Sequence, residues 1–192
     1  MTAAARRIVV GISGASGAAL GVRVLELARG AGYETHLVVS RGARATITSE
    51  LGMSPADVAA RADVVHADGN LGATIASGSF RTAGMIVAPC SIKTLSAIAN
   101  SHADTLLSRA ADVTLKERRP LVLMVRETPL HRGHLRLMSL AAESGAVIFP
   151  PVPAFYNEPQ TIADVVDTAA RRALEQAGVF LDDTTRWAGM QA

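Results

Sequence analysis

Short apolar runs alternate with longer helical patterns along the chain. Valine and isoleucine dominate the short runs, which is typical of strands buried on both faces of a parallel sheet. The longer segments repeat their apolar residues at helical spacing. The pattern predicts strands over residues 8–12, 36–39, 64–66, 85–88, 121–125 and 146–149. It predicts helices over residues 18–30, 43–50, from 55 onward, 92–119 in one or two pieces, 131–144 and 162–177.

Strands that alternate with helices indicate an α/β fold. We expect a doubly wound, mostly parallel sheet with helices on both faces, a three-layer sandwich of the Rossmann or flavodoxin-like kind. Pro89 should end the fourth strand. Residues 67–82 are rich in Gly, Ser, Asn and Thr and should form a long, functional loop. Since no repeat or linker interrupts the chain, a single domain is expected over residues 1–192, with 179–192 as a C-terminal tail.

Composition excludes several classes of protein. The 192 residues are 49% hydrophobic, which is enough for one packed core and too apolar for disorder. A formal charge of +2 argues against a nucleic-acid-binding surface. No apolar run of about 18 residues is present, so no membrane span is expected. The first residues do not resemble a secretory signal and the single cysteine, Cys90, excludes an intrachain disulfide. A cytoplasmic protein that binds neither nucleic acid nor membrane is the expectation.

Gly11, Gly14 and Gly17 lie in the turn between the first strand and the first helix. Many such turns are only tight turns, but glycine also lets the backbone approach a ligand, and a helix N-terminus favours an anion. The spacing is G-x-x-G-x-x-G rather than the dinucleotide pattern, and the second strand ends at Ser40, where an NAD site would have an acidic residue. A Walker A motif is also absent. A mononucleotide such as FMN fits these features.

Polar residues follow several predicted strands, and the carboxyl ends of parallel strands meet at one edge of the sheet. Hydroxyls, backbone amides and one arginine there make a plausible flavin and phosphate site. Ser91 and Thr94 fit helix caps as well as ligand contacts, and they can serve as both. The residues at these strand ends are Ser16, Ser40, residues 89–94, Arg126, Glu127 and Tyr156.

A cationic set consists of Arg109, Lys116, Arg126 and Arg172, with Tyr156 expected nearby. Arginine forks suit phosphate oxygens and lysine adds a point charge. Arg109 and Lys116 are seven residues apart, so one helical face can carry both. On spacing alone, the basic residues 116–119 are more typical of a solvated helix end.

Five segments occur along the chain in this order: GISGASG (11–17), APCSIKTL (88–95), RAADVTLKERR (109–119), RETPL (126–130) and PVPAFY (151–156). Together they resemble the UbiX-type flavin prenyltransferase family. The resemblance runs from about residue 7 to 187 and is greatest to the small B subunits encoded with hydroxyarylic acid decarboxylases. Residues 100–105 depart from the family pattern.

The resemblance implies a flavin-binding domain that joins dimethylallyl phosphate to reduced FMN, first at N5 and then at C6, without a metal. The product, prenylated FMN, would serve a UbiD-type decarboxylase. Large homo-oligomers, often dodecamers with sites at subunit interfaces, are also implied.

Site residues are carried over from the same resemblance, position by position. The FMN-binding residues would be Gly14, Ala15, Ser16, Ser40, Ser91, Ile92, Lys93, Thr94 and Arg126. The residues that bind dimethylallyl phosphate would be Arg109, Lys116, Tyr156 and Arg172. The catalytic residues, which handle protons and position the reacting groups, would be Ser16, Glu50, Glu127 and Lys116.

Two other functions remain open from the sequence. One is an FMN-dependent decarboxylase of the cysteine type, which shares the fold, although its active-site histidine and Pro-x-Met-Asn block have no clear counterpart here. The other is an FMN carrier subunit without chemistry. Cys90 lies beside the expected site but is interpreted as a small buried residue rather than a nucleophile.

Overall fold

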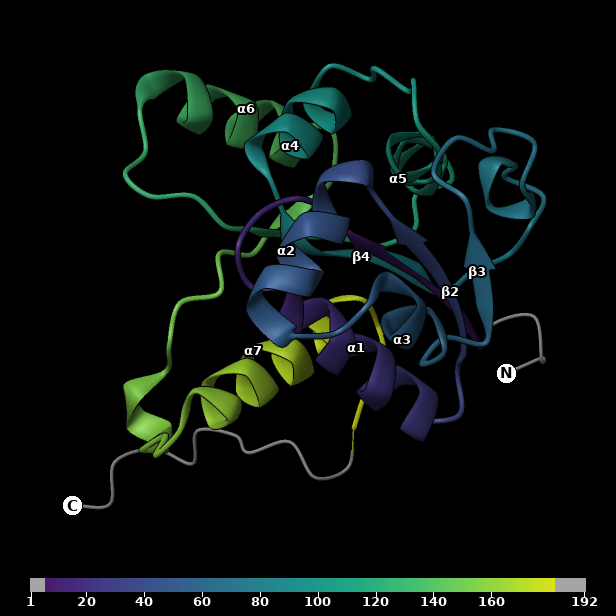
Figure 1. Ribbon diagram of the computed structural model, residues 1–192. Coiled ribbons are helices and arrows are strands. Elements are labelled where there is room, and N and C mark those ends of the chain that lie inside the picture. Colours follow the sequence, from purple (N-terminus) through teal and green to yellow (C-terminus); the bar gives the residue numbers. More distant parts are fainter. Residues whose placement is uncertain (1–5, 182–192) are drawn as a thin grey trace.

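The computed structural model describes residues 6–181, which form one parallel sheet covered by helices on both faces (Figure 1). The strands, in chain order, are β1 (Arg7–Ile12), β2 (Glu34–Val39), β3 (Val64–His66), β4 (Gly84–Cys90), β5 (Leu121–Val125) and β6 (Val147–Ile148). The α-helices are α1 (Ala18–Gly30), α2 (Arg41–Leu51), α3 (Pro55–Ala59), α4 (Ile92–Ala99), α5 (Leu106–Lys116), α6 (Arg132–Glu143) and α7 (Ile162–Gln176). The short 3-10 helices are η2 (Thr74–Ala76) and η3 (Phe155–Asn157).

The sheet has the order β3-β2-β1-β4-β5-β6. The chain starts in the middle at β1, builds outward through β2 and β3, and then crosses back to place β4 on the other side of β1. In sheets of this kind ligands bind at the carboxyl ends of the strands where the direction of winding reverses. That point lies between the carboxyl ends of β1 and β4.

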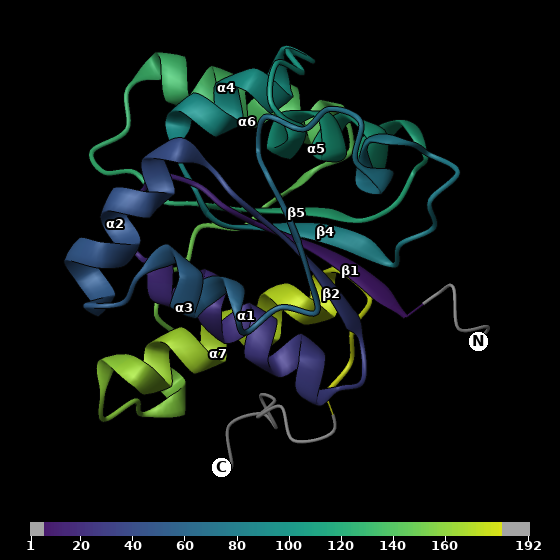
Figure 2. The same ribbon diagram turned by 45° about the vertical axis from the view of Figure 1, so that its right-hand side comes forward.

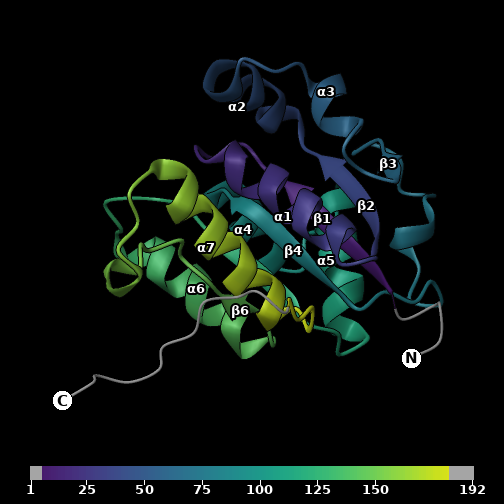
Figure 3. The same cartoon turned by 90° about the horizontal axis from the view of Figure 1, so that it is seen from below.

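Apolar side chains alternate between the two faces of the sheet and form a core on each. Ile8 and Val10 of β1 pack with α1 and α7, whereas Val9 points to the face covered by α4, α5 and α6 (Figure 2). This is the two-residue period expected of a strand buried on both faces. Viewed from below, α1 and α7 lie side by side across one face (Figure 3).

The predicted fold class is confirmed, and most of the predicted elements are present. The helical pattern over residues 92–119 is two helices, α4 and α5, separated by the segment that departs from the family pattern. The loop over residues 67–82 is present with one turn of 3-10 helix, η2, within it. Of the expected tail, Val179 is buried in the core beside Leu174, and residues 182–192 lie outside the described residues.

The prediction that Pro89 ends the fourth strand is wrong, because β4 continues to Cys90. The pairing of β4 with β5 shifts its register between Val87 and Cys90, so the strand passes the missing N–H of proline as an irregularity. The Pro89 carbonyl accepts hydrogen bonds from the backbone N–H and the hydroxyl of Ser13. Within residues 6–181 no helix is long and apolar enough to cross a membrane.

Gly21 lets α1 lie directly on the sheet. A Cβ atom at this position would lie 2.3 Å from the Ala88 carbonyl oxygen and 2.8 Å from the side chain of Ile12. Both neighbours are buried, so α1 would have to move away from β4. The same helix carries the glycine turn at its N-terminus, so its close packing also fixes the place of that turn.

We therefore expect Gly21→Ala to lower the free energy of unfolding by about 1–3 kcal/mol, the usual range for overpacking. Gly30→Ala, at the end of the same helix with no atom within 4 Å of the added Cβ, is the matched control. It should be neutral or slightly stabilising, because alanine favours helix. Urea denaturation of both variants measures the difference, and equal stabilities would contradict the packing argument.

Candidate flavin site

A cavity of about 600 Å³ lies at the carboxyl edge of the sheet, within the usual size of a small-molecule site. The β1–α1 turn, the start of α2, the start of α4 and the segment before and within α5 supply its walls. Of the residues predicted to bind FMN, the cavity is lined by Gly14, Ser40, Ser91, Lys93 and Thr94. Further lining residues, which the sequence reasoning did not select, are Arg41, Gly42, Asp68, Ala97, Asp104, Thr105, Leu107 and Ser108.

Three helices begin at this cavity. Their N-cap residues are Ser40 for α2, Ser91 for α4 and Thr105 for α5, and each side chain accepts a hydrogen bond from the backbone N–H three residues later. Helix N-termini carry partial positive charge and favour anions. Arg41 and Lys93 add full positive charges beside α2 and α4, whereas the carboxylates of Asp68 and Asp104 line the wall beside α5, where Asp68 accepts from the Leu107 N–H. The side of the cavity at α2 and α4 therefore suits a phosphate group. The hydroxyls of Ser40, Ser91 and Thr105 act as helix caps, which is one of the two roles expected for Ser91 from the sequence.

The backbones of the β1–α1 turn and the first turn of α2 contact each other at one wall of the cavity. A Cβ atom on Gly14 would lie 2.9 Å from the carbonyl carbon and 3.0 Å from the Cα of Gly42. The β1–α1 turn and the first turn of α2 can approach this closely only without side chains. The result is a cradle of main-chain groups, hydroxyls, two cations and two carboxylates, in which the main-chain groups and the cations fit the phosphate of a flavin mononucleotide.

Ser13 connects the glycine turn to the strand beside it. Its buried hydroxyl donates to the Pro89 carbonyl over 2.8 Å and accepts from the Ser91 N–H over 2.7 Å. One side chain thus joins the end of β1 to the β4–α4 connection. The sequence reasoning missed this residue, and a hydroxyl inside the glycine turn was the available signal.

Glu50, from the last turns of α2, binds the N-terminus of α1. Its carboxylate accepts from the backbone N–H groups of Gly17 at 2.8 Å and Ala18 at 3.0 Å, and it is hydrogen-bonded to the Ser16 side chain. Burial alone would raise the pKa of Glu50, but these hydrogen bonds and the charge of Arg126 lower it below its usual value. The structure therefore brings together Ser16, Glu50 and Arg126, all of them predicted site residues.

The predicted residues that follow the strands lie at the same edge. Arg126 comes directly after β5, and its N–H donates to the Cys90 carbonyl over 3.1 Å. Glu127 is next to it and is exposed. Ala15 is part of the glycine turn and Ile92 begins α4.

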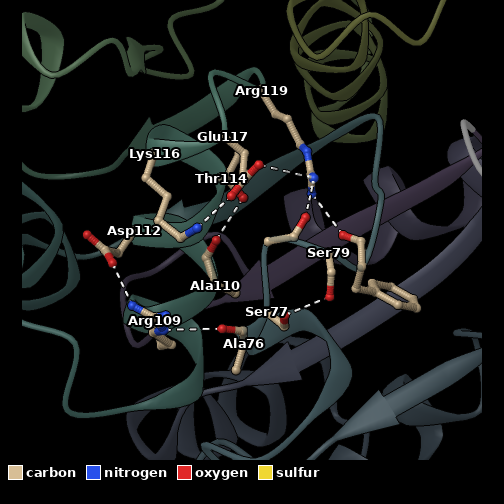
Figure 4. A network of polar contacts seen from close by, with 12 residues as sticks. Ala76, Ser77, Ser79, Arg109, Ala110, Asp112, Thr114, Lys116, Glu117 and Arg119 are labelled. Atoms are coloured by element: carbon tan, nitrogen blue, oxygen red, sulfur yellow. Dashed lines mark hydrogen bonds and ion pairs between the residues drawn. The ribbon is translucent and has the colours of Figure 1, made fainter.

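The cations on α5 lie away from the cavity. Arg109 and Lys116 share one face of the helix, as their spacing predicted, and point toward residues 76–79 (Figure 4). The N-cap of α5, Thr105, lines the cavity. Because a helix rises 1.5 Å per residue, Lys116 at the other end of α5 lies about 16 Å from Thr105 along the helix axis.

Arg172 and Tyr156 lie elsewhere again. Arg172 is near the end of α7, on the face of the sheet opposite to α5, and forms an ion pair with Glu175. Tyr156 belongs to η3 and is exposed. None of the four predicted donor-binding residues lines the cavity described above. Their roles remain predictions.

Comparison with known proteins decides the family. A model of the Flavoprotein family matches residues 2–173. The flavin prenyltransferase UbiX of Escherichia coli K12 is 57% identical over 187 residues, covering 96% of this chain and 99% of the relative. The solved structure of AnUbiX (PadA1) in complex with FMN and dimethylallyl pyrophosphate has a TM-score of 0.94 and 51% identity, covering 97% of this chain and 100% of that one. This chain belongs to the UbiX flavin prenyltransferase family.

A dodecameric FMN-dependent UbiX-like decarboxylase from Escherichia coli O157:H7 is also similar, with a TM-score of 0.91 and 49% identity over 95% of this chain and 100% of that one. The FMN-dependent cysteine decarboxylase TvaF has a TM-score of 0.64 and 14% identity over 90% of this chain and 98% of that one, a likeness in fold alone. The cysteine-type decarboxylase is therefore set aside in favour of the UbiX family.

Cys90 fits its interpretation as a packing residue of this UbiX family member. It is fully buried at the end of β4, and burial raises the pKa of its thiol far above the usual value. A protonated, inaccessible thiol is a poor nucleophile. Among residues 6–181 no group of three or more His, Cys, Asp or Glu side chains could hold a metal ion.

The lowered pKa of Glu50 predicts a specific response to acid. The folded state favours the carboxylate, so its stabilisation is present above the usual pKa of a glutamate and is lost as the pH falls through the folded-state value. Glu50→Gln should therefore make the free energy of unfolding depend less on pH between 6 and 3.

The measurement is urea denaturation at a series of pH values, with Glu143→Gln on the exposed surface of α6 as the control. The control should keep the pH dependence of the unchanged protein. An identical pH dependence in Glu50→Gln would show that the carboxylate does not stabilise the start of α1.

Proposed function

We propose that this protein is a flavin prenyltransferase that joins dimethylallyl phosphate to reduced FMN and supplies prenylated FMN to a UbiD-type decarboxylase. Membership of the UbiX family, together with a cavity at which three helices begin, supports this function. The carbon–oxygen bond of the donor breaks as a bond to N5 forms, and phosphate leaves. The prenyl double bond then takes up a proton, the tertiary carbon cation so formed bonds to C6, and the C6 proton passes to the phosphate as base, so that ring closure consumes no net proton.

The cavity of a single chain would hold the FMN. Gly14 and Ser40 line the cavity and would offer backbone and a hydroxyl. Ala15, Ser16 and Arg126 lie at the same edge of the sheet and would complete the site with backbone and polar side chains. The start of α4, with Ser91, Ile92, Lys93 and Thr94, adds backbone N–H groups and one ammonium. Ser16 is hydrogen-bonded to Glu50, whose carboxylate also senses the charge of Arg126, and Ser16 would position or pass a proton. Glu127, the residue after Arg126, would share in this proton handling.

Several copies of the chain would complete each site. Arg109, Lys116, Tyr156 and Arg172 do not reach the cavity of their own chain, so we propose that neighbouring copies supply them to the phosphate of the donor. Departure of that phosphate builds negative charge, and fixed cations stabilise it where it forms. The relative from Escherichia coli O157:H7 is described as dodecameric, and we propose a similar assembly here.

The surface around Tyr156 supports such an assembly. Val152, Phe155 and Ile162 expose 74%, 78% and 84% of their surface in the same stretch of chain. Large apolar side chains gathered on a surface mark sites of protein association.

Reduced FMN and the unpaired thiol of Cys90 both suit a reducing compartment, so the cytoplasm remains the expected location.

The direct test is incubation of the protein with reduced FMN and dimethylallyl phosphate, followed by mass spectrometry of the flavin. We expect the flavin to gain one C5 unit. A parallel reaction with the diphosphate identifies the preferred donor. Flavin that is bound but never gains the C5 unit from either donor would indicate a carrier and contradict the proposal.

The second test concerns the composite site. Lys116→Ala and Arg172→Ala should each reduce turnover at limiting donor by at least about tenfold, because a fixed cation at the leaving group is lost, while FMN affinity stays within about twofold. Co-assembly of Lys116→Ala subunits with Ser16→Ala subunits should restore part of the activity, because some sites then receive both intact residues. Unchanged turnover, or no recovery in the mixed oligomers, would contradict the assignment.

A further inference from the structure

Two arginines, Arg109 and Arg119, donate hydrogen bonds to the backbone of residues 76–80. Arg109 Nε donates to the Ala76 carbonyl at 3.2 Å, and Arg119 donates to the carbonyls of Gly78 at 2.6 Å and Phe80 at 2.8 Å (Figure 4). Arg119 is only 16% exposed and is therefore a fixed part of the structure. The loop and α5 are thus joined along the face that carries Lys116.

The carboxylate of Glu117 lies between Lys116 and Arg119. Its Oε1 atom is 2.5 Å from Lys116 Nζ, and its Oε2 atom is 3.9 Å from a terminal nitrogen of Arg119. Neighbouring side chains on a helix do not normally face each other. Glu117 is the C-cap of α5, where the chain leaves the helix, so its carboxylate can turn back to the lysine. The hydrogen bond from Lys116 and its charge lower the pKa of Glu117.

The ion pair of Lys116 and Glu117 lies directly against Gly78. A Cβ atom at Gly78 would be 2.0 Å from Glu117 Oε1 and 2.8 Å from Lys116 Nζ. Any side chain at this position would displace both groups. Gly69, in the same loop, has no atom within 4 Å of a built Cβ.

We propose that Glu117, which lies against Gly78 and 3.9 Å from Arg119, is a positioning residue that orients the ammonium of Lys116 for the phosphate of the prenyl donor. The inference rests on the proposed function, in which Lys116 reaches that phosphate in a neighbouring copy. A free lysine loses considerable rotamer freedom on binding, and a side chain that is already fixed avoids that loss.

Lys116 remains available to a ligand in this arrangement. Its side chain is 47% exposed. An ammonium has three N–H donors, so the bond to Glu117 leaves others for phosphate oxygens.

Gly78→Ala is the sharpest test, because it displaces the ion pair without changing any charge. The primary readout is calorimetric binding of dimethylallyl phosphate to the assembled protein loaded with oxidised FMN, which does not undergo transfer. We expect donor binding to weaken by about two- to tenfold, the effect of one side chain that is no longer held in place. FMN affinity, measured by fluorescence quenching, should not change. Gly69→Ala is the matched control and should bind the donor as the unchanged protein does.

Glu117→Gln provides an independent variant, with Glu143→Gln at the end of α6 as its control. It should weaken donor binding by a similar factor and raise the donor KM while leaving kcat within about twofold. Glu117→Asp should recover part of the affinity. Unchanged donor binding in Gly78→Ala and Glu117→Gln would overturn the proposal. Tighter binding in Glu117→Gln would also overturn it, because the carboxylate would then only compete with phosphate for Lys116.

Loss of the transferase activity and loss of the positioning role give different results in these experiments. If the unchanged protein neither binds the donor nor transfers a C5 unit, the proposed function fails and the positioning role fails with it. If the unchanged protein transfers the unit and the variants bind the donor equally well, only the positioning role is refuted. Thermal melting and the size of the assembly confirm that each variant is folded.

Discussion

The backbones of two turns touch at Gly14 and Gly42, and the arrangement of the flavin site depends on that contact. Side chains at either position would separate the β1–α1 turn from the start of α2. Ser13 joins the same turn to Pro89 and Ser91 by hydrogen bonds, so β1, α2 and α4 are held at one point. The cavity is built around this point, and its walls combine main-chain groups, helix-capping hydroxyls and the side chains of Arg41 and Lys93.

Most of the cations that the proposed reaction would use lie away from this cavity. The cavity lies at the carboxyl edge, whereas Lys116 and Arg172 lie near the far ends of helices that run back along opposite faces. The end of α7 reaches Gly84, the first residue of β4. A single chain thus provides a cradle for a flavin and, at a distance, cations for a phosphate. Under the proposed function, assembly completes the active site, and the ion pair between Lys116 and Glu117 already forms within one chain.

Much of the fold was predictable because local patterns determine it. Buried strands such as residues 121–125 and helix caps such as Ser91 have clear sequence signals. The path of β4 through Pro89 was not predictable, because it depends on the contact with Ser13, which lies 76 residues away in the chain. The site was predicted in part: the spacing of Arg109 and Lys116 showed that they share a face, but not that residues 76–80 cover that face. Such contacts arise only when the loop and the helix pack together.

The most direct test of the central claim is a crystal structure of the assembled protein with oxidised FMN and dimethylallyl phosphate. We predict that FMN occupies the cavity beside Gly14 and Ser91, and that Lys116, Tyr156 and Arg172 of neighbouring copies surround the phosphate of the donor. A structure in which FMN binds elsewhere, or in which those three side chains stay far from every donor phosphate in the assembly, would contradict the account.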